Sequence, residues 1–410
     1  MTQQEAMRVL LMTETFSPEI GGGETQAELL ASALVRRGHT VTVLTRRSRA
    51  DTPREEQYGG VRVVRVAPTG SGRRRKWGLV ATTPAPLLGW RDQIDLIFVS
   101  GFRILGIPAI AAARMLDKPC VLKADSNGEM SGEFFRPGLV KSRMRFDSMT
   151  VRSFLSMRNR MLRGASGFVA ISSEIEHELM EHGIHAGRVQ RIPNGVDTTR
   201  FRPASPEEKA ALRVRLGLPC GPIAVYSGRF VTYKGLPLLL RVWDELRERL
   251  PAATLLLVGE GGHDMHACEA EMRQYVTDRG MQSSVRFTGP VTAVEDWLRA
   301  SDVFALPTEN EAFGLSLVEA MACGIAVVAT RVGGIRDIMV NGTNGLFIRA
   351  GDFEALRSSL EMLLTDPASA AAMGRQARAN AVRRFGEDAV AVAYEDLFRS
   401  VLRERLRAVA

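Results

Sequence analysis

Cysteine is scarce in this 410-residue chain, and the few cysteines are far apart. They are Cys120, Cys220, Cys268 and Cys323. This spacing fits neither a disulfide framework nor a zinc pair, and buried, reduced thiols are expected instead. The six histidines also lack the helical spacing and carboxylate support that metal sites usually have. We therefore predict that the protein needs no metal and no other cofactor.

Long apolar runs are missing as well. No stretch reaches eighteen apolar residues, and the N-terminal MTQQEAMRVLLMTE lacks the basic region, apolar core and cleavage site of a signal peptide. Hydrophobic residues still make up 45% of the chain, enough to fill two cores at this length. The sequence predicts a globular, cytoplasmic protein with two domains.

Acidic residues do not balance the basic ones in the first half of the chain. Residues 1–200 carry a net charge of +9 and residues 201–410 a net charge of −1. Two basic segments, 73–77 and 141–163, also contain apolar side chains. Such segments either pack against their own domain or lie on an anionic membrane, and we expect a reversible membrane contact at its inner face. Nucleic acid is not expected, because repeated aromatic platforms and readout motifs are absent.

Strands and helices alternate from the start of the chain. The apolar run 7–12 is typical of a strand buried on both faces, and residues 13–23 form a glycine-rich loop before a helix and a second strand. A dinucleotide-binding fold, with Arg46 and Arg47 reading a 2′-phosphate, is the alternative. It is disfavoured because three consecutive glycines do not reproduce G-x-G-x-x-G.

The same alternation restarts after a link rich in proline and glycine near residues 192–206. We therefore predict an α/β protein made of two Rossmann-like βαβ domains. The first comprises residues 1–193 and a C-terminal helix at 387–410, and the second comprises residues 194–386.

The segment TENEAFGLSLVEAMACGIAVVATRVGG at 308–334 carries the strongest functional signal. A helix beginning at Gly314 would offer unpaired N–H groups and its positive dipole end to an anion such as a diphosphate. Glu311 and Glu319 would flank that position as acceptors for sugar hydroxyls. Two glutamates at this spacing also occur on solvated helices, but apolar residues surround Glu319.

This segment resembles the donor-site signature of the retaining glycosyltransferases of family 4, which have the GT-B fold. The likeness continues in GGGE at 21–24, PNGVD at 193–197, SGRFVTYKG at 227–235, VGEG at 258–261 and NGTNG at 341–345. It implies that Arg229 and Lys234 neutralise the diphosphate and that the C-terminal helix returns to the first domain. The donor-binding residues that it implies are Gly22, Gly23, Arg229, Lys234, Gly259, Glu311, Phe313, Gly314, Leu315, Ser316 and Glu319, with Arg229, Lys234 and Glu311 as the catalytic ones.

The sequence departs from the family on the acceptor side. Many members have a histidine near the end of the strand in KPCVLKADSNGEM, where this chain has Lys123 and Asp125. These two residues are acceptor-side candidates, and a strand-end salt bridge is the alternative interpretation.

The resemblance implies transfer of a sugar from a UDP- or GDP-linked donor to an acceptor hydroxyl, with retention at the anomeric carbon. A glycan, a glycolipid or a lipid-linked intermediate is the expected acceptor. A nucleotide-sugar epimerase, a phosphorylase or an inert sugar-nucleotide-binding protein on the same scaffold remains an alternative.

Overall fold

The computed structural model describes residues 5–19, 21–70, 78, 82, 87–136, 145–262 and 265–409. The chain divides into two compact units. Unit 1 comprises Met1–Gly195 and Glu387–Ala410, and unit 2 comprises Val196–Gly386. Residues 73–77 and 141–144 of the predicted basic segments lie outside the described residues.

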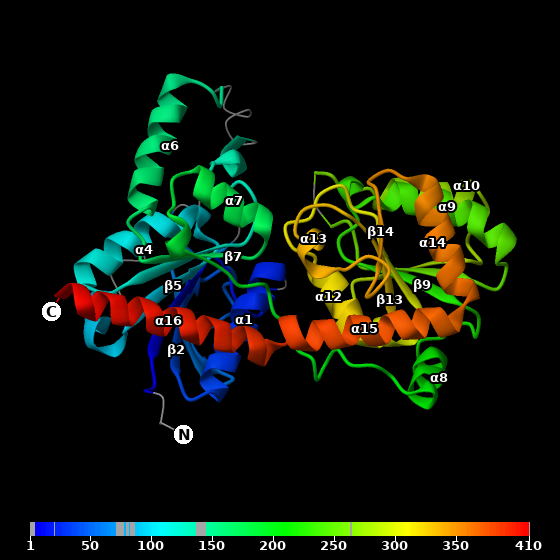
Figure 1. Ribbon diagram of the computed structural model, residues 1–410, viewed down its shortest axis with the longest axis horizontal. Helices are drawn as coiled ribbons and strands as arrows, with labels where there is room; N and C mark the ends of the chain where they lie inside the picture. Colours follow the sequence, from blue (N-terminus) through cyan, green and yellow to red (C-terminus); the bar gives the residue numbers. More distant parts are fainter. Residues whose placement is uncertain are drawn as a thin grey trace. The chain divides into compact units, whose positions relative to one another are not determined.

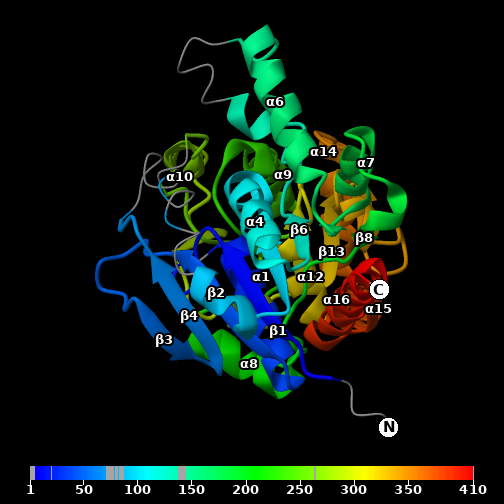
Figure 2. The same ribbon diagram turned by 90° about the vertical axis from the view of Figure 1, so that its left-hand side faces the viewer.

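Unit 1 is built on an eight-stranded sheet with the order β3-β4-β2-β1-β5-β6-β7-β8. The strands are β1 (Arg8–Thr13), β2 (Thr40–Arg46), β3 (Glu55–Tyr58), β4 (Val61–Val66), β5 (Leu96–Ser100), β6 (Cys120–Ala124), β7 (Gly167–Ala170) and β8 (Val189–Arg191). Only β3 runs antiparallel to its neighbour, and Figure 2 shows it at the edge of the sheet. The five residues of β5 and of β6 are all buried, as expected for parallel strands covered on both faces.

Helices cover this sheet and supply part of its core. They are α1 (Gly22–Arg36), α4 (Phe102–Leu116), α6 (Met149–Leu162), α7 (Ser173–Glu181) and α16 (Glu387–Val409), with short 3-10 turns at Leu88–Gln93, Glu133–Phe135 and Ala186–Arg188. Helix α16 packs against α1, and Phe98 of β5 contacts the rings of Tyr394 and Phe398 on α16. The C-terminal helix is therefore part of unit 1. Helix α6 stands out from the rest of this unit (Figure 1).

Unit 2 contains a six-stranded, fully parallel sheet with the order β11-β10-β9-β12-β13-β14. Its strands are β9 (Ile223–Ser227), β10 (Thr254–Val258), β11 (Val285–Gly289), β12 (Val303–Leu306), β13 (Ala326–Thr330) and β14 (Leu346–Ile348). Its helices are α8 (Pro206–Arg215), α9 (Leu236–Arg249), α10 (Glu269–Asp278), α11 (Val294–Ala300), α12 (Leu315–Ala322), α13 (Ile335–Ile338), α14 (Phe353–Thr365) and α15 (Pro367–Phe385), with a 3-10 turn, η4, at Thr232–Lys234. Two α/β units with Rossmann-like parallel sheets confirm the predicted fold class.

No helix among the described residues combines the length and the apolar character that crossing a membrane requires. Apolar side chains of the helices are instead buried inside the units. Trp243, Leu239 and Leu246 of α9, for example, are fully buried.

Candidate active site

The strand order of unit 2 reverses between β9 and β12. Successive strands lead outward on one side from β9 to β10 and β11, and on the other side from β12 to β13 and β14. Ligands of open α/β sheets bind at such a switch point, beyond the carboxyl ends of the strands. The loops that follow β9 and β12 are therefore the place to look for a ligand site.

Backbone contacts hold these two loops together. The N–H of Glu309 donates to the carbonyl of Tyr233 at 2.8 Å, and the Thr308 hydroxyl donates to the same carbonyl at 3.1 Å. Gly235 has a φ of 72°, and a Cβ atom there would collide with the carbonyl of Pro307. Only glycine allows this approach, which brings the end of η4 against the loop after β12.

The structure brings together two of the predicted catalytic residues. The ammonium group of Lys234 forms an ion pair with the carboxylate of Glu311, and both side chains are largely buried. Arg229 is exposed and donates through Nη2 to the Tyr233 hydroxyl at 3.1 Å. Tyr233 also lies beneath the Lys234 ammonium, 5.9 Å from ring centroid to Nζ. Arg229 and Lys234 thus both lie next to Tyr233 at the switch point.

The predicted helix after this loop is α12, and it begins at Leu315. Gly314 precedes it with a φ of 109°, a conformation that favours glycine. The first N–H groups of a helix have no partner within it, so those of Leu315 and Ser316 are suited to an anion. Phe313 is buried and packs its ring edge-on against Phe385, at 5.8 Å. Its side chain therefore serves packing, and only its backbone remains a candidate for donor binding.

Glu319 lies on α12 and is partly buried. Desolvation raises the pKa of its carboxyl to about 7, opposed by nearby Arg200 and reinforced by Glu295. Arg200 itself donates to Glu295 at 2.9 Å. Sequence reasoning missed Arg200 and Glu295, because they lie far from Glu319 in the chain and belong to no recognised motif.

Gly259, another predicted donor-site residue, follows β10. Its φ is 128°, and a Cβ atom there would collide with the carbonyl of Gly228. Its N–H donates to Gly289 at 3.1 Å. The glycine thus permits close packing of the turns after β9, β10 and β11, directly beside the residue that precedes Arg229.

The remaining predicted residues lie in unit 1. Gly22 and Gly23 form the first turn of α1 rather than the end of a loop. A Cβ atom at Gly23 would lie 4.0 Å from Oδ2 of Asp125, and one at Gly101 would lie 3.0 Å from it. The Asp125 carboxylate therefore sits between two glycines at the carboxyl edge of the sheet.

Lys123 is buried and does not reach the surface. Its ammonium group pairs with Oδ1 of Asp125 at 2.7 Å, and the Ser100 hydroxyl donates to Oδ2 at 3.1 Å. Lys123 therefore forms the strand-end salt bridge that was the alternative interpretation. Asp125, partly exposed at 18% of its side chain, is the member of the pair that a ligand can reach.

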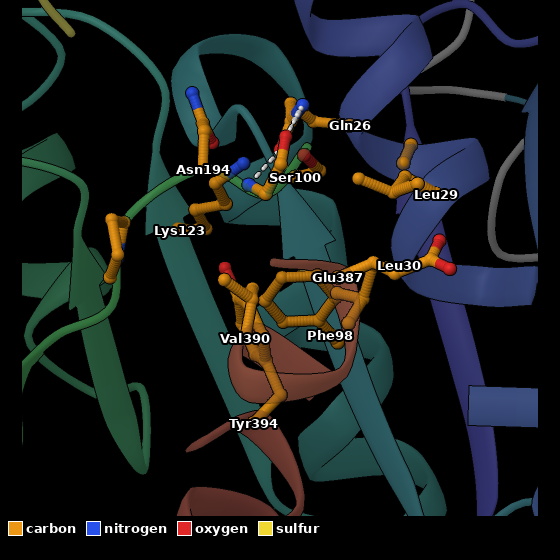
Figure 3. A pocket seen from close by; sticks show the side chains of 13 residues that line it. Gln26, Leu29, Leu30, Phe98, Ser100, Lys123, Asn194, Glu387, Val390 and Tyr394 are labelled. Carbon is orange, nitrogen blue, oxygen red and sulfur yellow. Dashed lines mark hydrogen bonds between the residues drawn. The ribbon is translucent and has the colours of Figure 1, made fainter. Parts of the chain in front are cut away.

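Figure 3 shows a small cavity that Lys123 helps to line, between α1, β5, β6 and the start of α16. Its free volume is about 10 Å³, room for about one water molecule. Oδ1 of Asn194 is buried here and has no hydrogen-bond partner in the part of the chain that the structure describes. Gln26 exchanges two hydrogen bonds with Gly195, at 2.7 and 2.8 Å, and so fixes the chain at the end of this unit. A space of this size holds no sugar.

The arginines of α6, in the second basic segment, differ in their exposure to solvent. Arg152 and Arg160 are exposed, but Arg158 is buried and donates to backbone carbonyls. Val151 and Leu155 are likewise buried in unit 1. One face of α6 thus packs against its own domain, and Arg158 lies on that face.

The described residues contain no cluster of three or more histidine, cysteine, aspartate or glutamate side chains that could hold a metal ion.

The two arginines of the dinucleotide-binding alternative form hydrogen bonds with backbone carbonyls. Arg46 is buried and donates to Gly70, and Arg47 donates to the carbonyls of Thr52 and Ala50 at 2.9 and 2.6 Å. All four cysteines are free, and Cys220 is exposed whereas the other three are buried.

Known families match both parts of the chain. Residues 20–200 match Glycosyltransferase Family 4, and residues 221–366 match Glycosyl transferases group 1. The GDP-mannose-dependent alpha-(1-6)-phosphatidylinositol monomannoside mannosyltransferase of Mycolicibacterium smegmatis is 31% identical over 89% of this chain and 91% of its own length. The chain belongs to glycosyltransferase family 4.

Other glycosyltransferases are similar to this family 4 member along nearly its whole length. The D-inositol 3-phosphate glycosyltransferase of Xylanimonas cellulosilytica is 29% identical over 94% of this chain and 93% of its own length. HepE of Anabaena, solved with UDP and glucose, superposes with a TM-score of 0.75 at 22% identity, covering 96% of this chain and all of that one. Sucrose-phosphate synthase of Thermosynechococcus elongatus gives 0.76 at 23% identity, with coverages of 98% and 100%. These structures share the GT-B fold, and the chain is a glycosyltransferase.

Proposed function

We propose that this glycosyltransferase moves a sugar from a UDP- or GDP-linked donor to an acceptor hydroxyl with retention at the anomeric carbon. The observation that carries the proposal is the pairing of Lys234 with Glu311 at the switch point of unit 2, beside Arg229 and the amino end of α12. Arg229 and Lys234 would stabilise the charge that grows on the departing diphosphate. Glu311 would accept hydroxyls of the transferred sugar, and Glu319 those of the ribose.

The donor must replace part of the existing Lys234–Glu311 contact. A diphosphate oxygen would take over Lys234, and the Glu311 carboxylate would then turn its acceptor capacity to sugar hydroxyls. These contacts require no metal, because two cations and the helix dipole face the leaving group. For retention, the proposed route is attack on the same face as the departing phosphate, because no carboxylate can be assigned from the sequence as a covalent nucleophile.

The acceptor is proposed to be a polar headgroup, such as a cyclitol phosphate or a lipid-linked glycan. The names of the relatives that act on inositol 3-phosphate and on phosphatidylinositol monomannoside support this class. The test pairs UDP-glucose and GDP-mannose with D-inositol 3-phosphate and with phosphatidylinositol vesicles. Mass spectrometry detects the product, and NMR gives its anomeric configuration. A product of inverted configuration, or donor turnover to an epimer without transfer, would refute the proposal.

We also propose that the protein docks reversibly on an anionic membrane through the outer face of α6. Met149, Phe154 and Met157 expose 85%, 52% and 61% of their surface there, next to exposed Arg152 and Arg160. Apolar side chains flanked by cations suit the boundary of an anionic bilayer.

Cosedimentation with vesicles that contain phosphatidylglycerol measures this contact. Wild-type protein should bind at low salt and dissociate at high salt, and Met149→Ser with Met157→Ser should bind less. Met115→Ser, which changes a methionine on α4 that exposes 57% of its surface, is the control. Equal binding to purely neutral vesicles would argue against this docking mode.

A further inference from the structure

We propose that Arg158 and Asn159 of α6 are positioning residues for the acceptor, acting through the loop 125–131. The proposal rests on the proposed function, because it takes Asp125 as an acceptor-side residue. It concerns the inner face of α6, which is distinct from the outer face discussed for membrane docking.

The loop begins at the carboxyl end of β6, where ligands of parallel sheets bind. Its first residue, Asp125, is the one that Gly23 and Gly101 leave accessible. Whatever fixes the backbone of this loop therefore sets the position of the Asp125 carboxylate and the Ser126 hydroxyl.

Helix α7 holds the N–H side of the loop. The carboxylate of Glu178 accepts hydrogen bonds from the backbone N–H groups of Gly128, Met130 and Ser131, at 2.8, 3.1 and 2.8 Å. Hydrogen bonds to a charged acceptor are the stronger kind. One side chain thus fixes three of the loop's seven peptide groups.

Helix α6 holds the carbonyl side. Arg158 donates to the carbonyl of Glu129 at 2.8 Å and to that of Met130 at 3.4 Å, and Asn159 donates to the Met130 carbonyl at 2.9 Å. Both side chains are buried, with exposures of 3% and 7%. Burying a guanidinium group costs free energy, and here that group is used to hold two loop carbonyls.

The Glu129 side chain connects this part of the loop to Asp125 and Ser126 on the acceptor side. Its side chain is fully buried, and its Oε1 accepts the N–H of Asp125 at 3.0 Å and the hydroxyl of Ser126 at 3.3 Å. Its Oε2 has no partner within the described residues. The contacts therefore run from α6 to the backbone of Glu129 and from the Glu129 carboxylate to Asp125 and Ser126.

The test is Arg158→Lys, which keeps the charge but loses the fork that reaches two carbonyls. The matched control is Leu162→Ala, which removes a fully buried side chain from the same helix where it packs near Gly106 of α4. We expect Arg158→Lys to raise the acceptor KM by roughly 10- to 100-fold, because small displacements of a binding group have large kinetic effects. The donor KM should stay within about twofold, since the donor residues of unit 2 are untouched.

Hydrogen exchange provides a second measurement that needs no acceptor. Arg158→Lys should speed amide exchange at residues 128–131, whereas Leu162→Ala should lower the melting temperature without selectively affecting this loop. Unchanged loop exchange in Arg158→Lys, or equal changes in donor and acceptor KM, would overturn the proposal. If wild-type protein transfers sugar to none of the acceptor probes, the proposed function fails, and the exchange result still decides whether Arg158 orders the loop.

Discussion

At the scale of single residues, the desolvated carboxyl of Glu319 predicts a pH-dependent donor affinity. Burial raises its pKa to about 7, so the group is neutral below this pH and ionised above it. If ribose hydroxyls donate to the carboxylate, binding favours the ionised form. The Kd of UDP-glucose or GDP-mannose should therefore fall about 10-fold between pH 6 and pH 8.

Calorimetric titration at several pH values measures this change, and Glu319→Gln is the control. The variant should bind more weakly at pH 8 and show no rise in affinity across this range. A wild-type Kd that is flat from pH 6 to pH 8 would contradict the assignment of Glu319 to the ribose.

The two cations beside Tyr233 make a second prediction at this scale. Arg229→Ala or Lys234→Ala should each lower kcat by roughly 10²-fold or more, because each would remove a group that stabilises the leaving diphosphate. Lys209→Ala is the matched control, since Lys209 also pairs with a carboxylate, Asp302, at 2.6 Å, but near the amino end of β12. Steady-state rates of nucleoside diphosphate release measure the effect. Equal losses in the control and in Lys234→Ala would indicate general destabilisation instead.

At the scale of elements, Glu395 connects α16 to the rest of unit 1. Its buried carboxylate accepts from Arg37 and lies 3.0 Å from Nε2 of His39. Because Nδ1 of His39 accepts the N–H of Met7 at 3.1 Å, Nε2 carries the proton and donates to Glu395. Burial alone would raise the pKa of Glu395, but the hydrogen bonds from Arg37 and His39 outweigh it and lower the pKa to about 2.

This depressed pKa predicts an acid-sensitive contribution to stability. The contribution is fully present above the carboxyl's ordinary pKa and is lost as the pH falls from about 4.5 toward 2. Glu395→Gln should lower the free energy of unfolding by roughly 3 kcal/mol at pH 7 and by less near pH 3. Urea unfolding at both pH values tests this, with Glu404→Gln, an exposed residue of the same helix, as the control. A loss that is as large at pH 3 as at pH 7 would disprove the linkage.

These elements also show which parts of the structure could be predicted from the sequence. The strands β9, β10, β12 and β13 were predictable because apolar runs and glycine punctuation are local signals. The inward turn of Arg158 was not, because its partners lie 28 and 29 residues away in the chain and its neighbours Arg152 and Arg160 look the same in sequence. For Lys123 the sequence left two interpretations open, an acceptor-side residue or a strand-end salt bridge, and only the assembled sheet shows that its ammonium group pairs with Asp125.

At the scale of the whole molecule, the chain is two units with separate cores, and the predicted donor residues with charged or polar side chains all lie in unit 2. A donor should therefore stabilise that unit by mass action, adding about 2.7 kcal/mol at a concentration of 100 Kd. The prediction is that UDP or GDP raises the melting temperature and protects amides at 229–235 and 309–319 from hydrogen exchange. Arg229→Ala should reduce both effects at the same nucleotide concentration, whereas Lys209→Ala should leave them intact. Protection confined to unit 1, around Asp125, would place the nucleotide on the other sheet and refute the assignment of the donor site to the β9–β12 switch point.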